Sequence, residues 1–172
     1  MDTLNLYYYK PIMKNLIIIA SFLLLNSCKS GKMNQLTIID TDGNKNIAIL
    51  KDKDRESFEL TQKDLEAINE ILKTAVAKYN IEKKTHFKNK PITNLQLESY
   101  LINLKIYKRQ YVPFKNEQEQ KEIWINCFCS LDGHYKWQTE IVFVQDGGKC
   151  YFNLKINLDK KTYSMFSVNG QA

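Results

Sequence analysis

The stretch that decides the fold is Thr61-Gln-Lys-Asp-Leu-Glu-Ala-Ile-Asn-Glu-Ile-Leu-Lys-Thr-Ala-Val-Ala-Lys-Tyr-Asn80. Thr61 is followed three residues later by Asp64, which is typical of a capped helix start. Apolar side chains then recur at steps of three and four residues, and charged side chains occupy the opposite side. The apolar positions are Leu65, Ile68, Leu72, Ala75 and Tyr79. The pattern predicts an amphipathic helix over residues 61–80, with one face on a core and the other in water.

Strand-like runs dominate the chain after this helix. Residues 83–90 are charged and predict a loop, and residues 91–100 fit a short helix or irregular chain equally well. Five runs then follow that are rich in β-branched and aromatic residues and bounded by turn residues. They are residues 101–112, 122–130, 137–145, 150–158 and 162–168. Separators of three to nine residues join antiparallel neighbours, because parallel strands require a longer crossover.

Two of these runs differ in how they distribute apolar residues. Residues 150–158 alternate apolar and polar side chains, which predicts a strand that buries one face. Residues 141–144 are apolar at every position, which predicts a central strand covered on both sides, with the helix as one cover. The fold class predicted is therefore α+β, with one main amphipathic helix packed on an antiparallel meander-type sheet. This arrangement resembles the cystatin-like and nuclear-transport-factor-like (NTF2-like) architectures in topology, and it specifies no activity.

Two further β-branched runs precede the helix. Residues 35–40 and 46–50 are separated by Thr41-Asp42-Gly43-Asn44-Lys45, whose Asp-Gly and Gly-Asn pairs suit the positive φ values of hairpin turns. The sequence therefore predicts a β-hairpin before the helix.

The N-terminus has the features of an export leader. Lys14 precedes a ten-residue apolar run, residues 16–25, which is the length of a signal-peptide core and too short to span a bilayer. Its ending, Leu25-Asn26-Ser27-Cys28, resembles the lipobox of bacterial lipoproteins. The resemblance implies cleavage before Cys28 and a lipid on its thiol. Met13 is an alternative start that leaves the same mature chain.

The leader divides the chain into three parts. They are a signal peptide over residues 1–27, a polar lipid-anchored tether over residues 28–34, and a single α+β domain over residues 35–172. No acidic cluster follows Cys28, whereas surface-exported lipoproteins of the Bacteroidota carry one there. We therefore expect a protein of the cell envelope that faces the periplasm, on either the inner or the outer membrane.

The C-terminal third carries a second resemblance. Residues 146–158, Asp-Gly-Gly-Lys-Cys-Tyr-Phe-Asn-Leu-Lys-Ile-Asn-Leu, and the ending Phe-Ser-Val-Asn-Gly-Gln-Ala of residues 166–172 are similar to small uncharacterised lipoproteins of the Bacteroidota. The resemblance supports the compartment and implies no reaction.

The charge balance and the cysteines narrow the possible partners. The chain from Cys28 on has 23 basic and 18 acidic residues, which suits a protein beside an anionic membrane surface. Nucleic acid is not an expected partner, because the lysines are scattered among acids.

Cys127 and Cys129 lie two apart on a predicted strand, so they share a face and should not bridge each other. Cys150 can pair with either of them only if its strand lies next to theirs. The alternative, equally compatible with the sequence, is that the three cysteines are small buried thiols.

Chemistry-bearing motifs are missing from the mature chain. It contains neither a nucleophile elbow nor a phosphate-binding glycine loop, and its Cys and His spacings do not match zinc sites. No cofactor or metal is expected, and His134 is explained by turn chemistry. The binding candidates are His134, Tyr135 and Trp137, beside Tyr107, Tyr111 and Phe114, because exposed aromatic residues near loop tips often contact a partner. The alternative is that these rings pack on the sheet.

Three functional classes remain open. The first is a non-catalytic binding or assembly lipoprotein that contacts an envelope protein or a small ligand, and this is our expectation. The second is an inhibitor or immunity-type protein acting through rigid loop tips. The third is a small-ligand enzyme of the NTF2-like kind, which requires a deep pocket between helix and sheet.

Overall fold

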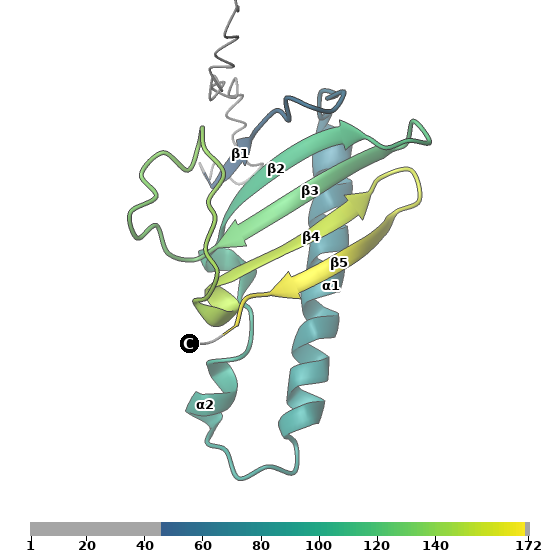
Figure 1. The fold of residues 1–172 in the computed structure, drawn as a ribbon. Helices are drawn as coiled ribbons and strands as arrows, with labels where there is room; N and C mark the ends of the chain where they lie inside the picture. The colour runs from purple at the N-terminus through teal and green to yellow at the C-terminus, as the bar shows by residue number, and fades with distance from the viewer. Residues whose placement is uncertain (1–45, 171–172) are drawn as a thin grey trace, which may run out of the picture. The chain divides into compact units, whose positions relative to one another are not determined.

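The computed structural model describes residues 46–170, which form an α+β arrangement as predicted. One long helix, α1 (Gln62–Phe87), packs against a five-stranded mixed sheet that is not closed (Figure 1). A short helix, α2 (Asn94–Glu98), and two 3-10 turns, η1 (Leu104–Ile106) and η2 (Gly148–Cys150), complete the elements. Among the described residues no helix is both long and apolar enough to cross a bilayer.

The strands follow one another across the sheet in chain order. They are β1 (Ile47–Ile49), β2 (Lys108–Lys115), β3 (Lys121–Phe128), β4 (Tyr151–Asn157) and β5 (Thr162–Val168). The strands from β2 to β5 pair antiparallel, which confirms the predicted meander for these four strands. β1 differs, because it pairs with β2 in parallel and makes the sheet mixed.

β1 pairs in parallel with β2, and the expected hairpin before the helix stays a prediction. The run over residues 35–40 lies outside the described residues, and the run over residues 46–50 forms β1 beside β2, with Ile47 opposite Arg109. The physical reason is that α1 lies between β1 and β2 in the chain. A helix of this length is the crossover connection that parallel neighbours require.

The first half of α1 forms as the sequence predicts. Thr61 Oγ1 accepts a hydrogen bond from the backbone N–H of Asp64 (3.1 Å), and the Asp64 carboxylate accepts one from the N–H of Thr61 (2.9 Å). This capping box satisfies two backbone donors that the helix itself leaves free. Ile68, Leu72 and Ala75 are buried on the sheet, while Leu65 and Tyr79 are half-buried at the margin.

The end of α1 corrects the prediction. The helix runs seven residues past Asn80, so most of the predicted loop over residues 83–90 is helical. Asn80 does not end the helix, and its side chain links α1 to the chain after α2. It donates a hydrogen bond to the carbonyl of Ile102 and accepts one from the N–H of Ile102, both at 2.9 Å. Residues 91–100, left open by the sequence, contain α2, which begins with a capping box at Thr93.

Two predicted strands differ from those observed. The run over residues 101–112 becomes a strand only at Lys108, because η1 interrupts it. The run over residues 137–145 forms no strand, so the prediction of a central strand there is wrong. β3 has the central place in the sheet, and residues 137–145 lie over one of its faces.

Alternate residues of the strands supply two hydrophobic clusters, one on each face of the sheet. The cluster on the α1 side includes Ile123, Ile125, Leu154 and Ile156. The smaller cluster on the opposite face consists of Ala48, Leu50, Val112, Phe128, Trp137 and Val142. Every buried member of both clusters lies within residues 47–158, so a chain that begins at Gly31 keeps all of the core that the structure describes.

Candidate functional site

The loop between β3 and β4, residues 130–149, covers part of the sheet face opposite α1, and we name it the cover loop. Trp137 and Val142 of this loop belong to the smaller hydrophobic cluster, together with residues of β2 and β3. In Figure 1 the loop runs beside the sheet between the end of β3 and the start of β4. A long loop with little regular structure of its own is often a functional segment.

A disulfide closes the base of the cover loop. Cys129 and Cys150 are bonded, and the N–H of Cys129 donates to the carbonyl of Cys150 at 2.9 Å. The pairing settles the alternatives that the sequence left open, because β3 and β4 are neighbours. Cys127 is the remaining thiol of the described cysteines and is buried. Burial raises its pKa to about 12, so it is a neutral thiol of low reactivity at neutral pH.

A buried pair of amide side chains fixes the cover loop to the sheet. Gln110 of β2 and Asn126 of β3 are paired in register, and the Asn126 amide donates to Gln110 Oε1 at 3.0 Å. Gln110 Nε2 also donates to the carbonyls of Trp137 (2.5 Å) and Glu140 (2.7 Å). The N–H and C=O of Val142 bond to Gln110 Oε1 (3.0 Å) and Asn126 Nδ2 (2.7 Å). Two side chains therefore satisfy four backbone groups of the loop.

These bonds explain why residues 137–145 are not a strand. Backbone groups that would pair with a neighbouring strand bond to side chains that rise from the face of the sheet. The chain at Val144 is held in the same way, because Asn169 Nδ2 donates to its carbonyl at 2.5 Å. The apolar run is therefore extended and alternates: Val142 points into the cluster, while Ile141 and Phe143 are exposed.

The cover loop brings the three predicted binding residues together, but it does not expose all of them. Tyr135 is 86% exposed, and His134 is half-buried in the turn. Trp137 is only 7% exposed, and its ring meets that of Phe128 edge-on with centroids 5.8 Å apart. All three line a hollow of about 280 Å³ that also includes Ile141.

The other predicted aromatic residues belong to the core. Tyr107, Tyr111 and Phe114 are buried, as the alternative interpretation of the sequence held. Tyr107 and Tyr111 lie in the cluster on the α1 side. Burial raises the pKa of Tyr107 well above its ordinary value, and its hydroxyl donates to the carbonyl of Lys149 at 2.6 Å. These rings therefore position the site without forming its surface.

A second hollow adjoins the first and shares Ile141 with it. It measures about 450 Å³ and is lined by the segment after β1 and by β2 and β3: Asp52, Lys53, Asp54, Arg55, Val112, Trp124 and Ile141. Ile141 thus stands between two depressions, and Phe143, 74% exposed, lies two residues further along the loop. The sequence analysis did not identify this part of the site.

The charged groups of the second hollow are held in place. The Arg55 guanidinium bonds the Asp52 carboxylate through Nε (2.7 Å) and Nη2 (2.5 Å), and it lies 3.5 Å from the centre of the Phe114 ring. Partial burial opposes ionisation of Asp52, but hydrogen bonds from the Asp54 N–H and from Arg55 outweigh it and lower its pKa. Asp52 and Arg55 therefore form a fixed ion pair in the wall of the hollow that Trp124 also lines.

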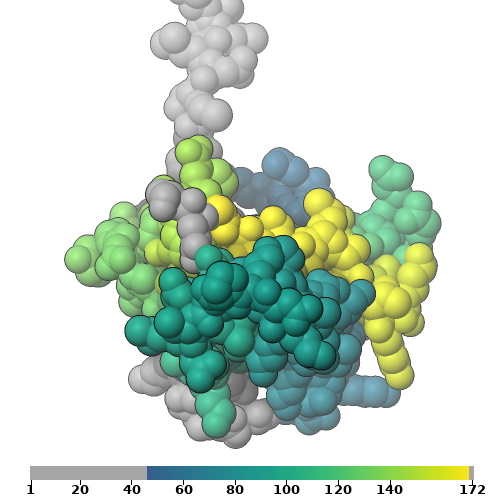
Figure 2. All heavy atoms as spheres, turned by 90° about the horizontal axis from the view of Figure 1, so that it is seen from below, coloured from purple at the N-terminus to yellow at the C-terminus, as the bar shows by residue number. Residues whose placement is uncertain are grey.

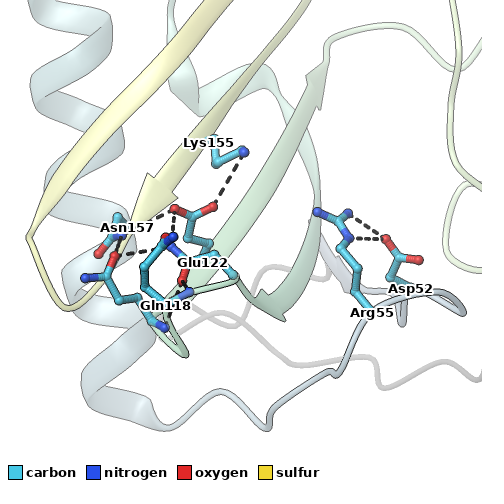
Figure 3. A network of polar contacts seen from close by, with 8 residues as sticks. Asp52, Arg55, Gln118, Glu122, Lys155 and Asn157 are labelled. Carbon is cyan, nitrogen blue, oxygen red and sulfur yellow. Dashed lines mark hydrogen bonds and ion pairs between the residues drawn. The ribbon is translucent and has the colours of Figure 1, made fainter.

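A separate polar network marks the end of the sheet near the β2–β3 turn (Figure 3). Glu122 accepts from Asn157 Nδ2 (3.3 Å) and pairs with Lys155 (3.5 Å). Lys155 Nζ also lies 5.6 Å from the Phe114 ring centre, so cations approach this ring from β4 and from Arg55.

The described residues offer no group of three or more His, Cys, Asp or Glu that is arranged to hold a metal ion. Comparisons with protein-family models, with curated proteins and with solved structures found no match to this chain. Its function is therefore argued from its own geometry.

Gln110 and Asn126 are the residues that sequence reasoning missed. Their signal is an amide within an otherwise apolar strand, at Arg109-Gln110-Tyr111-Val112 and Ile125-Asn126-Cys127-Phe128. A buried amide requires partners, because leaving it unpaired is costly. Such a residue in a predicted strand indicates that another segment passes over that face.

Proposed function

We propose that this protein is a lipoprotein of the bacterial cell envelope, anchored through Cys28, that binds an envelope protein through the cover loop without catalysing a reaction. Tyr135, Ile141 and Phe143 form the contact surface, and the two hollows on either side of Ile141 accept side chains of the partner.

One observation carries the binding role, namely the fixation of the cover loop by Gln110 and Asn126. Four backbone groups of the loop bond to these buried amides, and the Cys129–Cys150 disulfide closes its base. Because the disulfide holds the ends of the loop and the two amides hold its middle, the loop loses little conformational entropy on binding. Exposing large apolar side chains on such a loop has a cost in water that a contact with a partner removes.

The envelope location has two independent supports. The leader ends in a lipobox-like sequence at Cys28, and the domain has a disulfide between Cys129 and Cys150. Disulfides persist in the periplasm and are rare in the bacterial cytosol. The lipid would hold the domain at a membrane while the cover loop contacts the partner.

An inhibitor or immunity-type role is the second candidate, because a disulfide-closed loop with exposed aromatic and aliphatic tips suits the occlusion of another protein's site. The enzyme class receives less support. Its pocket would lie between α1 and the sheet. A hollow of about 490 Å³ lies between α1 and the start of β5, but its lining has no histidine and its one carboxylate, Glu70, forms an exposed ion pair with Lys73. Deeper contacts are closed, because Ile68 and Leu72 belong to one apolar cluster with Ile125 and Leu154.

The binding role is tested with a photo-crosslinking amino acid in the full-length protein in living cells. Placed at Phe143, it should give a discrete adduct with another protein. Placed at the exposed Lys63 on α1, it should give none. Adding Ile141→Ser to the Phe143 probe should reduce the adduct about tenfold, since an apolar contact of this size contributes on the order of 1.5 kcal/mol.

Equal adduct yields at Phe143 and Lys63, or a yield that Ile141→Ser leaves unchanged, would overturn the proposal. Once the partner is identified, its own activity separates the two candidate roles. A loss of that activity on binding identifies an inhibitor, and an unchanged activity identifies an assembly role.

A further inference from the structure

The C-terminal part of α1 extends past the sheet and forms a projecting end with α2. The buried residues of α1 are Ile68, Leu72, Ala75 and Val76, so full burial stops before residue 77. The helix continues to Phe87, and Figure 1 shows its lower part together with α2 beyond the edge of the sheet. We name residues 78–105 the basic tip; Figure 2 views the domain from this end.

The basic tip holds the net charge of the described domain. It contains six lysines, Lys78, Lys83, Lys84, Lys88, Lys90 and Lys105, against the two acids Glu82 and Glu98, for a net charge of +4 with His86 neutral. The remaining described residues, 46–77 and 106–170, contain 14 basic and 14 acidic residues and are neutral overall. The charge is therefore concentrated in one continuous segment of the sequence, and the structure places this segment at one end of the domain.

Exposed aliphatic side chains lie among these lysines. Leu95 of α2 is 82% exposed, Ile81 of α1 64% and Ile106, directly after the tip, 59%. On α1, Ile81 lies three residues from Lys78 and from Lys84 and seven from Lys88, so helical spacing places all four on one face. The three lysines are exposed as well. An apolar side chain flanked by lysines on one helix face is typical of segments that lie in a membrane interface.

Side-chain contacts fix the elements of the basic tip relative to one another. Asn80 bonds both backbone groups of Ile102, and the rings of Phe87 and Tyr100 pack with centroids 4.6 Å apart. Lys149 Nζ donates to the carbonyl of Glu98, which ties α2 to the base of the cover loop. The lysines and the aliphatic side chains are therefore presented by elements that hold a fixed relation to each other.

We propose that the basic tip docks on the surface of an anionic lipid bilayer. The lysines bind lipid phosphates while Ile81, Leu95 and Ile106 enter the interface between headgroups and acyl chains.

Nucleic acid fits the surface of the basic tip less well than a bilayer does. The tip has no arginine, and its three aromatic side chains are half-buried. Phe87 and Tyr100 pack on each other, and Tyr79 packs on Phe166, so they present little free ring surface to a base. The contact with the bilayer goes beyond the proposed function, because it needs neither the lipid on Cys28 nor the cover loop.

Vesicle sedimentation with residues 31–172 tests the proposal, since this chain keeps all of the described core and lacks Cys28. The protein should bind vesicles of mixed phosphatidylglycerol and phosphatidylcholine, and not vesicles of phosphatidylcholine alone. High salt should release it. Lys84→Gln with Lys88→Gln should weaken binding by roughly 20-fold, at about fivefold per lysine. The control pair, Lys63→Gln with Lys160→Gln, makes the same change in charge at exposed positions outside the tip and should have little effect.

Leu95→Ser separates a bilayer from a soluble polyanion, because it leaves the charge unchanged. It should weaken vesicle binding about fivefold or more, whereas Met165→Ser, at an exposed apolar residue of β5, should not. Circular dichroism melts establish that every variant is folded. The proposal is overturned if anionic vesicles are not bound, if the control pair weakens binding as much as the tip pair, if Leu95→Ser has no effect, or if an RNA oligomer binds more tightly than the vesicles.

Discussion

Gln110 and Asn126 face each other across β2 and β3, and the Asn126 amide donates to Gln110 Oε1 at 3.0 Å in the buried face of the sheet. The Gln110 oxygen accepts a second bond from the N–H of Val142, also at 3.0 Å. The two side chains form hydrogen bonds with backbone groups of the cover loop, which a neighbouring strand would form if the loop were part of the sheet. The stability of the domain and the shape of the candidate site are therefore coupled.

Replacing Gln110 with Met, which has a similar volume, should destabilise the domain by about 2–4 kcal/mol. The change leaves the carbonyls of Trp137 and Glu140 and the Val142 N–H without this partner, and buried unpaired groups cost roughly 1–3 kcal/mol each before relaxation. Urea unfolding measures the difference. Gln118→Met in the exposed turn is the control and should cost less than about 0.5 kcal/mol. Equal costs would contradict the role assigned to the pair.

Truncating Leu72 to Ala should cost roughly 2–5 kcal/mol, because Leu72 is fully buried between α1 and the sheet. Glu70→Ala is the control on the same helix. Glu70 makes an exposed ion pair with Lys73 at 2.9 Å, and its loss should change stability by less than about 0.5 kcal/mol. Unfolding in urea reports both values, and similar small losses would show that α1 is peripheral.

Peptide mapping without reduction should recover Cys129 joined to Cys150, and Cys127 as a thiol. Cys129→Ser should lower the free energy of unfolding by about 3 kcal/mol, the value expected for a closed loop of this length. Adding a reductant to the wild type should have the same effect, and no further effect on the variant. A bond between Cys127 and Cys129 would refute both the strand register and the closed base of the cover loop.

Stability should fall as the pH rises from about 9 to about 12, in part because of Cys127. Burial raises its pKa to about 12 in the folded state, whereas the unfolded thiol loses its proton near 9. Between these values the unfolded state binds fewer protons than the folded state, so a rise in pH favours unfolding. In Cys127→Ala, the free energy of unfolding should fall less between about pH 9 and about pH 12 than it does in the wild type, each protein being compared with its own value at neutral pH. Denaturant unfolding at several pH values measures it, and parallel curves would count against a neutral buried thiol.

Replacing Cys28 with Ala should prevent lipidation, because alanine has no thiol to carry the lipid. It should also prevent leader cleavage, which the lipobox resemblance places directly before Cys28. Metabolic labelling with an alkyne fatty acid, followed by intact-mass measurement, compares the two proteins. The wild type should lose residues 1–27 and gain the mass of a lipid. A wild-type protein of unmodified mass would remove the anchor from the proposed function and leave the vesicle experiment unaffected.

Local signals in the sequence account for the elements that were predicted well. The capping residues Thr61 and Asp64 and the apolar spacing of α1 act within a few turns, and the alternation in β4 acts within one strand. Both are properties of consecutive residues. Turn residues and short separators likewise give the antiparallel pairs β2–β3 and β4–β5, whereas the pairing of β3 with β4 across the long cover loop is not a local signal.

The elements that were predicted wrongly depend on distant residues. The helix continues past Asn80, whose side chain bonds the backbone of Ile102, 22 residues later in the chain. The run over residues 137–145 has the composition of a strand, yet its backbone partners are side chains of β2 and β3. The same holds within the site, where Tyr135 and Trp137 are two residues apart and only Tyr135 is exposed.

The sequence by itself determined the α+β class, the helix start, the antiparallel pairs β2–β3 and β4–β5 and the exclusion of a bridge between Cys127 and Cys129, because each follows from spacing along one element or across one short turn. Only the tertiary structure decided the parallel placement of β1, the Cys129–Cys150 bond, the cover loop and the position of the basic tip beyond the sheet. These features depend on which face of the sheet each segment covers. That choice is made when buried polar groups such as Gln110 and Asn126 find partners far away in the chain.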